Sequence, residues 1–391
     1  MSVLTLCFGN CGVHLAQYFY SIIFDDNNNF DSSLSNEYNK EYKNISESIF
    51  FEKKSNDFLE PRTILVDLAD PKIKTTSINW GFGPNSLAFN FIEGKNNNWS
   101  YYYHIKGPEV YEDVSNRLRN ELQKLDVTVK YFLIILSSSG GCSGLACFVL
   151  ENLKKEYAKI LFNIVIILPY ETKDAIQNYN TLFSVISQAG HSEIKVSFDD
   201  INEVCSKQLA SIFQPLENQH FTYFMSLVSD TKYKLLKTIS SPNYRKEYLS
   251  YESTPKWGAI INQTIRSLNE KSCLSLGNKI VSRGIVDNEL IKQLKFDKLN
   301  DTILFPTNIL DDVKFSHVYQ NKHFLNTKYL SVLSNSTVNV DSLNSVLKLA
   351  NRAFLHKAFI HHYSEFNTSR EDFKYAFSIT DEIIKDYYKL K

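Results

Sequence analysis

The sequence predicts an α/β fold in which a parallel sheet alternates with helices, and two stretches carry that prediction. The apolar run 131–136 indicates a buried strand, and it leads through the Gly/Ser-rich turn 137–144 into apolar residues 145–150 at helical spacing. Near the amino terminus, residues 3–8, 9–12 and 13–22 repeat the order of strand, glycine turn and helix. Parallel strands need such crossover helices, so both units belong to one Rossmann-like sheet.

Hydrophobic periodicity predicts the remaining elements in chain order. The Asn/Asp/Ser-rich segment Asp25–Glu60 is expected to be an exposed loop with a short helix. Further strands are predicted at 62–66, 162–168, 280–285 and 329–333, and helices at 113–124, 201–213, 257–265 and over much of 340–366.

Composition excludes several classes of protein. Lys+Arg and Asp+Glu both number 43, so the zero net charge gives no long-range field toward nucleic acid or an anionic membrane. No apolar run approaches the ~20 residues that span a bilayer. The six cysteines form no CxxC pair, which argues against zinc and a secreted disulfide framework and favours a reduced cytosolic protein.

The turn 137–144 has the chemistry of an anion site. It carries little side-chain bulk, so its backbone N–H groups can approach phosphate oxygens, and the helix behind it adds partial positive charge. Asp67 ends a predicted strand at the edge where open α/β sheets bind ligands, and it is a candidate to face Mg²⁺ through water. Plain chain reversal at the turn and a capping role for Asp67 remain alternative interpretations.

Several motifs together resemble the tubulin family. Residues 139–145 (SGGCSGL) are similar to its glycine-rich signature loop, with one residue missing and Cys142 at the threonine, and residues 1–19 (MSVLTLCFGNCGVHLAQYF) are similar to its opening strand and loop. Other matches follow in the family's order at 64–67, 97–99, 177–180, 198–202 and 351–356. The sequence around and between the motifs, such as ILVDLADPK at 64–72, most resembles the delta class, which acts in centrioles and basal bodies.

The resemblance implies a site for GTP or GDP, with Mg²⁺ at Asp67. In this sequence the phosphate-facing and ribose-facing positions are Gly9, Asn10, Cys11, Gly12, His14, Asp67, Asn97, Asn98, Ser139, Gly140, Gly141, Cys142, Ser143, Gly144, Glu171, Asp174 and Gln177. Phe198 matches the aromatic residue that stacks on guanine, and Asn202 matches the side chain that reads the base edge. Without the resemblance, Phe198 would be interpreted as a core aromatic and Asn202 as a surface residue.

Departures from the family pattern concern the same site. Tyr102 replaces a glycine, and a ring there is expected to crowd the phosphate; Gln177 replaces an acid at the ribose. Residues 180–198 are shorter than in the family, and Thr222 or a neighbour stands where a glutamate activates water in alpha-type chains. We therefore expect at most a very slow GTPase with no catalytic residue. The alternative is a pseudo-GTPase of the same fold that no longer binds nucleotide.

The resemblance also implies domains, partners and location. A GTP-binding domain is expected at 1–198, a central helix at 199–215, an intermediate α/β domain at 216–340 and C-terminal helices at 341–391. The expected partners are other tubulins or centriolar and basal-body proteins, in the cytoskeleton of the cytoplasm. An unrelated doubly wound nucleotide enzyme would need a catalytic group at a strand end beyond Asp67, and none stands in a recognisable setting. His361 and His362 are a poor metal pair because adjacent helical residues point about 100° apart.

Overall fold

A computed structural model describes most of the chain, in two compact units. The described residues are 2–67, 78–89, 97–125, 129, 131–169, 173–187, 192–196, 201–217, 227, 233–242, 256–268, 274–284 and 315–390. Unit 1 comprises Met1–Gln17, Glu47–Ile201 and Val340–Asp386, and unit 2 comprises Tyr18–Ser46, Asn202–Asn339 and Tyr387–Lys391.

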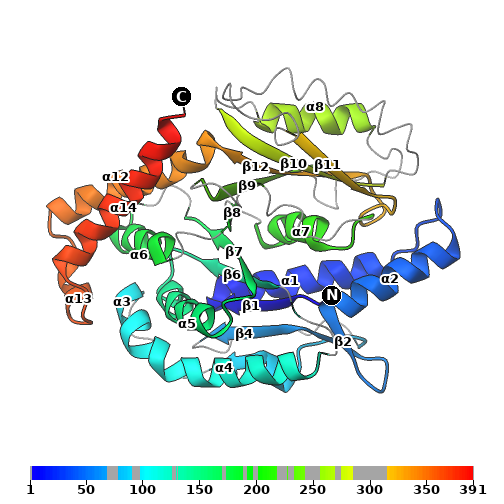
Figure 1. Ribbon diagram of the computed structural model, residues 1–391, viewed down its shortest axis with the longest axis horizontal. Coiled ribbons are helices and arrows are strands. Elements are labelled where there is room, and N and C mark those ends of the chain that lie inside the picture. Colours follow the sequence, from blue (N-terminus) through cyan, green and yellow to red (C-terminus); the bar gives the residue numbers. More distant parts are fainter. Residues whose placement is uncertain are drawn as a thin grey trace. The chain divides into compact units, whose positions relative to one another are not determined.

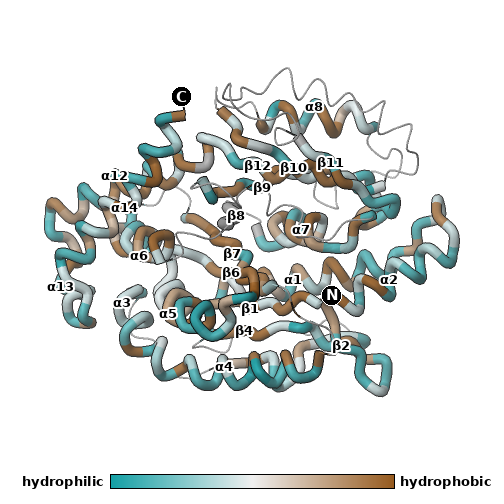
Figure 2. The backbone as a smooth tube through the Cα atoms, in the orientation of Figure 1, coloured by the Kyte–Doolittle hydropathy of each residue, from teal (hydrophilic) through white to brown (hydrophobic). Residues whose placement is uncertain are grey.

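Unit 1 is built on a parallel sheet, as predicted. In spatial order its strands are β8 (Ser192–Val196), β7 (Leu161–Ile167), β6 (Tyr131–Ser137), β1 (Leu4–Phe8), β4 (Thr63–Asp67) and β5 (Leu87–Phe89). All five residues of β1 and the first six of β6 are buried. Parallel strands covered on both faces have such continuous apolar runs, which Figure 2 shows in brown.

Helices connect and cover these strands (Figure 1). They are α1 (Gly9–Asn28), α3 (Trp99–Tyr101), the π-helical turn η2 (Tyr102–Lys106), α4 (Gly107–Gln123), α5 (Cys142–Glu156), α6 (Ala175–Ser187), α12 (Asp341–Leu355), α13 (Ile360–Ser364) and α14 (Arg370–Tyr388). Helix α5 packs between α4 and α6, and α12 packs on α6. Two short strands, β2 (Phe51–Lys53) and β3 (Leu59–Pro61), form a hairpin, and a 3-10 turn, η1, covers Pro84–Ser86.

Unit 2 contains a mixed sheet with a helix packed on one face. Its strands lie in the order β11 (Phe315–Gln320), β10 (Ser275–Arg283), β12 (Tyr329–Ser336) and β9 (Leu235–Ser241), and only β10 and β11 are parallel. Helices α7 (Ile201–Phe213) and α8 (Trp257–Leu268) and the 3-10 turn η5 (Thr337–Val340) lie largely in this unit. Successive strand residues face opposite sides, so Ile280 packs with Trp257 of α8 while Val281 packs with Leu216.

The expectation of an exposed loop with a short helix over Asp25–Glu60 is wrong in the extent of helix. Helix α1 continues to Asn28, and a second helix, α2, covers Asn36–Phe50. The buried residues of α2 are Asn39, Tyr42, Ser46 and Phe50, at helical spacing of three and four. Two of these four are polar, so the apolar periodicity that usually reveals an amphipathic helix is weak here.

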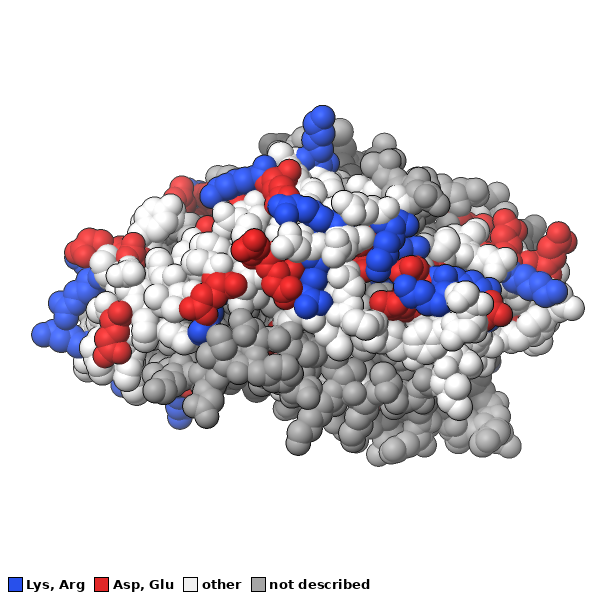
Figure 3. Space-filling model, turned by 90° about the horizontal axis from the view of Figure 1, so that it is seen from below, with Lys and Arg blue, Asp and Glu red and all other residues white. Residues whose placement is uncertain are grey.

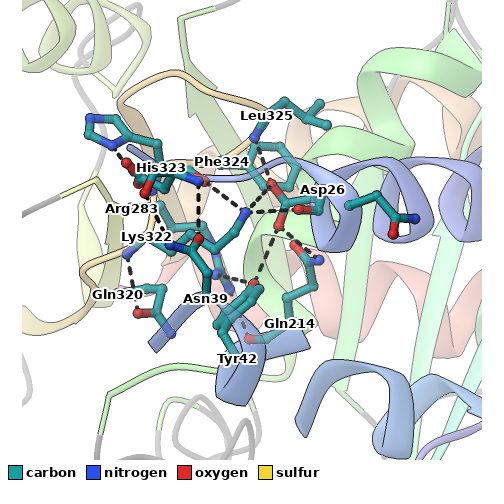
Figure 4. Close-up of polar contacts among 12 residues, drawn as sticks. Asp26, Asn39, Tyr42, Gln214, Arg283, Gln320, Lys322, His323, Phe324 and Leu325 are labelled. Carbon is teal, nitrogen blue, oxygen red and sulfur yellow. Dashed lines mark hydrogen bonds and ion pairs between the residues drawn. The ribbon is translucent and has the colours of Figure 1, made fainter. Parts of the chain in front are cut away.

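A buried ion pair in unit 2 joins the end of α1 to the segment after β11 (Figure 4). Asp26 and Lys322 are 1% and 2% exposed, and the Lys322 ammonium lies 3.3 Å from Asp26 Oδ1 and 2.8 Å from the Asp26 carbonyl oxygen. The backbone N–H of Leu325 also donates to Asp26 Oδ1, and the Gln214 side chain donates to Oδ2. A buried charge needs this degree of pairing, because desolvation costs several kcal/mol per ion.

Next to this pair, Arg283 closes the carboxyl end of α7. Its guanidinium is 1% exposed and donates to the carbonyl oxygens of Ser211, Gln214 and Pro215, at 2.6, 2.8 and 3.2 Å. Ser211 lies in the last turn of the helix and Gln214 and Pro215 follow it, where carbonyl oxygens lack helical partners. A cation at this end also complements the helix dipole.

Asp31 fixes the loop between α1 and α2 in the same unit. Its Oδ2 accepts hydrogen bonds from the backbone N–H of His323 and lies 2.8 Å from His323 Nδ1. Burial alone would raise the pKa of the Asp31 carboxyl, but hydrogen bonds from His323 and Ser33 outweigh it and lower the pKa to about 2. The charged form is therefore the one that the fold stabilises.

The surface along α4 carries both signs of charge. Arg117 pairs with Asp113 at 2.9 Å and Arg119 with Glu156 at 3.0 Å. Figure 3, a view from below, shows acidic and basic side chains interspersed among the described residues of that face. Within the described part of the chain, none of the helices has the length and apolar character needed to cross a bilayer.

Candidate functional site

Two strand-to-helix junctions of unit 1 lie side by side at the carboxyl edge of the sheet. Residues 9–12, predicted as a turn before the helix, form the first turn of α1, and residues 138–141 lead from β6 into α5. β1 and β6 are neighbouring strands with Phe8 opposite Leu136, so the turns that follow them emerge together. Gly9 has a left-handed backbone (φ 70°), and a Cβ placed on it would lie 2.9 Å from Cys142 Cβ. A Cβ on Gly12 would lie 2.8 Å from the carbonyl oxygen of Ile135. Both positions therefore require glycine.

The three glycines of the second turn have different surroundings. A Cβ on Gly144 would meet the carbonyl oxygen of Trp99 at 2.1 Å, and one on Gly141 would meet the Tyr102 ring at 2.4 Å. A Cβ on Gly140 would meet no atom within 4 Å, so the space beside its Cα is open. Gly140 is therefore the point of this turn that a ligand would reach most directly.

Hydrogen bonds hold the second turn in shape. Ser143 Oγ donates to the carbonyl oxygens of Gly140, at 2.6 Å, and Ser138, at 3.2 Å, so its buried hydroxyl stabilises the turn from inside. The side-chain oxygen of Asn97 accepts a hydrogen bond from the N–H of Gly141. An amide oxygen thus occupies the place on this N–H that an anion's oxygen would take.

The two asparagines of the 97–98 pair have different roles. Asn97 is exposed beside the turn, whereas Asn98 is buried and caps α3, accepting from the N–H of Ser100 at 2.8 Å. The side chain of Asn98 also donates to the carbonyl oxygen of His362 at 2.7 Å. Asn98 therefore caps α3 and links it to α13, and only Asn97 of the pair lies next to the turn.

Asn180 lies in the 177–180 match to the family, but it was not among the predicted site residues. Its Nδ2 donates to the carbonyl oxygens of Ser139, at 3.0 Å, and Asn97, at 3.1 Å. Its Oδ1 accepts from the N–H of Trp99 and the hydroxyl of Tyr363. The buried amide thus joins the turn, the 97–99 loop and α13, and its place in the QNYN motif was the only signal.

Tyr102 lies against the turn at the position where the family pattern has a glycine. The residue is 8% exposed, and its ring covers the face of Gly141. Burial, together with the nearby Cys142 thiol and Asp67 carboxyl, raises the pKa of the Tyr102 phenol well above its ordinary value. Tyr102 is therefore a neutral hydrogen-bonding group beside the turn at physiological pH.

Asp67 and Cys142 are neighbouring side chains at the carboxyl edge of the sheet. Asp67 ends β4 and is buried, and the Cys142 thiol donates toward Asp67 Oδ1 across 3.8 Å. Burial and the Asp67 charge raise the pKa of the Cys142 thiol, and burial raises that of Cys11 to about 11. Both thiols therefore stay protonated. Within the described residues, no three His, Cys, Asp or Glu side chains form a group able to hold a metal.

The other predicted residues are more scattered. Asn10 is exposed and His14 half-buried at the start of α1. Asp174 caps α6, accepting from the N–H of Ile176 at 2.8 Å, and Gln177 is half-buried on that helix. Asn202 is half-buried at the start of α7, in unit 2. Glu171, Phe198 and Thr222 lie outside the described residues.

Comparison with known proteins places this geometry in a family. A model described as Tubulin/FtsZ family, GTPase domain, matches residues 2–206, more than half of the chain. The tubulin delta chains of Canis lupus familiaris and Mus musculus are each 25% identical over alignments that cover all of this chain and all of the relative. The nucleomorph tubulin gamma chain of Guillardia theta is 24% identical, covering 89% of this chain and 84% of the relative.

Proposed function

This chain belongs to the tubulin family, and we propose that it binds GTP or GDP at the paired turns 9–12 and 139–144 of unit 1. The open space beside the Cα of Gly140 carries this proposal. A Cβ at Gly140 would meet no atom within 4 Å, so a phosphate oxygen would approach the turn there, next to the amino terminus of the 15-residue helix α5. GTP and GDP are the ligands that a tubulin GTPase domain implies.

Each residue of the turn region would have a distinct role toward the phosphates. The N–H groups of Gly140 and Cys142 would donate to phosphate oxygens, and the N–H of Gly141 would join them once Asn97 turns away from it. The Asn97 amide group would then donate to the same phosphates. Asp67, at the end of β4, would hold the waters of a bound Mg²⁺, whose charge would offset that of the phosphates.

The remaining predicted contacts are part of this proposal. Asp174, Gln177 and Glu171 would serve the ribose, and Phe198 and Asn202 the guanine ring, on the strength of their match to the family motif. Thr222 and its neighbours offer no base at neutral pH, so turnover is proposed to be very slow. In this reading the nucleotide acts mainly as a conformational cofactor.

The cellular proposal follows the delta class. We propose a cytoskeletal protein of the cytoplasm that assembles or maintains the triplet microtubules of centrioles and basal bodies, with other tubulins or centriolar proteins as partners. Its similarity to tubulin delta chains over the whole chain supports this proposal. Depletion in a ciliated cell should convert triplets to doublets in electron micrographs of basal bodies, and intact triplets would oppose the proposal.

The decisive biochemical experiment is a nucleotide inventory. The purified full chain is denatured, and the released nucleotides are separated by anion-exchange chromatography. Retained GDP or GTP near one molecule per chain is expected, with no rapid phosphate release during incubation with GTP. Absence of guanine nucleotide, both as purified and after incubation with GTP and Mg²⁺, would refute binding.

A pseudo-GTPase is the second candidate, and Tyr102 is the observation that favours it. Its ring covers Gly141, and the Asn97 amide already occupies the N–H of that residue. If these side chains close the site, Tyr102→Gly should create nucleotide binding that the natural chain lacks. If the natural chain already retains nucleotide, the pseudo-GTPase reading is excluded.

A further inference from the structure

The exposed side of α12 and the turn after it carry basic and apolar side chains without acidic ones. From Ser342 to Ser364 the sequence has no Asp or Glu, but it has two lysines or arginines on α12, another lysine in the turn, and three histidines. The exposed positions of α12 recur at helical spacing: Ser342, Ser345, Lys348, Arg352 and Leu355. One continuous stripe of the helix therefore faces solvent.

Two large apolar side chains are exposed at the end of this stripe. Leu355 is 79% exposed and Phe359 is 43% exposed. Phe359 has a left-handed backbone (φ 56°), as does Lys357 (φ 55°), and its ring stacks on His362. A left-handed conformation is costly for bulky residues, so the fold holds Phe359 outward against a local backbone preference.

The cations of the stripe are not neutralised within unit 1. Among the described residues, no carboxylate lies within ion-pair distance of Lys348, Arg352 or Lys357. Two acids of α14 pair within that helix, Glu371 with Lys374 at 4.0 Å and Asp381 with Lys385 at 2.5 Å. The stripe therefore presents uncompensated positive charge on a chain whose net charge is zero.

Hydrogen bonds anchor the turn that carries Phe359 and the helix α13 that follows it; in the turn, the hydroxyl of Tyr179 donates to the carbonyl oxygen of Ala358 at 3.2 Å. Asn98 donates to the carbonyl oxygen of His362 at 2.7 Å, and Ser100 Oγ donates to that of Phe366 at 2.6 Å. The hydroxyl of Tyr363 donates to Asn180 Oδ1 at 2.7 Å. A surface held in this way loses little conformational entropy when a partner binds.

We propose that the surface formed by Lys348, Arg352, Leu355, Lys357 and Phe359 docks an acidic, amphipathic helical segment of another protein. Acidic side chains of the segment would pair with the three cations, and its apolar face would cover Leu355 and Phe359. Charge complementarity selects this occupant. Two exposed apolar side chains offer a small anchor of the size that a peptide helix covers, and an acidic partner is the one that an acid-free stripe attracts.

The test uses the purified full chain and fluorescence anisotropy. The probe is a short labelled helical peptide with leucine along one face and glutamate on the other. Saturable binding is expected, weakening as salt rises, because the pairs are exposed and screened. The combined change Lys348→Glu and Arg352→Glu should weaken binding by about tenfold or more, which corresponds to about 1.4 kcal/mol.

Matched variants and probes decide between explanations. Leu355→Ser with Phe359→Ser should also weaken binding, whereas Tyr375→Ser on α14, at a residue 63% exposed, should not. The same peptide with lysine in place of glutamate should not bind. Equal binding of both peptides, or wild-type affinity in the charge-reversed variant, would overturn the proposal. Arg352-dependent binding to phosphatidylserine vesicles without peptide binding would replace it with a membrane surface.

Discussion

Substituting Gly140 with alanine separates ligand binding from folding. The added methyl meets no atom within 4 Å, and Gly140 does not have a left-handed backbone, so alanine fits the folded chain. The same change at Gly144 would place the methyl 2.1 Å from the carbonyl oxygen of Trp99, which is backbone and cannot turn aside. The two variants therefore form a matched pair within one turn.

Gly140→Ala is expected to preserve or raise the stability of the fold but to weaken nucleotide binding. Gly140→Ala should leave the free energy of unfolding unchanged or raise it by about 0.4–1 kcal/mol, because alanine restricts the unfolded chain. If phosphate approaches this backbone, the methyl should cost a charge-assisted hydrogen bond of about 1.5–3 kcal/mol, or roughly 10- to 150-fold in affinity. Gly144→Ala should instead destabilise the fold by about 1–3 kcal/mol or more.

The assay combines thermal unfolding with titration of a fluorescent GDP analogue at fixed Mg²⁺. Gly140→Ala is expected to melt at or slightly above the wild-type temperature and to bind the analogue weakly. Wild-type affinity in a fully folded Gly140→Ala protein would show that the turn is not the phosphate site. Gly141→Asp is a less clean test, since a side chain at that residue meets Tyr102 before it meets any ligand.

Three further predictions concern stability. Gly141→Ala should lower the melting temperature, and Tyr102→Ala in the same chain should restore part of it, because the added Cβ would lie 2.4 Å from that ring. Asp26→Ala should cost about 3–5 kcal/mol in urea unfolding, because it leaves the buried Lys322 ammonium unpaired. The Asp31 carboxyl has a pKa of about 2 in the folded chain, below its ordinary value. Its charged form therefore stabilises the fold by about 2 kcal/mol above about pH 4, and this stabilisation is lost as pH falls toward 2. The loss of unfolding free energy caused by Asp31→Asn should shrink over that range.

Controls exist for each of these predictions. Asp381 pairs with Lys385 at 2.5 Å on an exposed helix surface, so Asp381→Ala should cost less than about 1 kcal/mol. A loss equal to that of Asp26→Ala would mean that burial does not set the energy of the pair. A deficit of Asp31→Asn that stayed constant between pH 5 and pH 2 would contradict the lowered pKa, and failure of Tyr102→Ala to restore Gly141→Ala would place the strain elsewhere.

Local sequence by itself determined the parallel sheet and its two glycine turns. The strands β1 and β6 are apolar throughout because both faces of the sheet are covered, so their signal survives without knowledge of the fold. The extent of helix α2 escaped prediction because its buried face includes Asn39 and Ser46, and Asn39 is buried by hydrogen bonds with Asp31 rather than by apolar packing. A pattern of apolar residues cannot report a face that is polar.

Only the tertiary structure decided which side chains and carbonyl oxygens contact the residues of the turns. Which of Gly140, Gly141 and Gly144 is open depends on Tyr102 and Trp99, about forty residues earlier in the chain. The role of Asn180 depends on carbonyl oxygens of two other loops, and that of Asn98 on a carbonyl of α13. Sequence fixes what a residue can donate or accept, but the atoms that it reaches are set by contacts between segments distant in the chain, which no local pattern encodes.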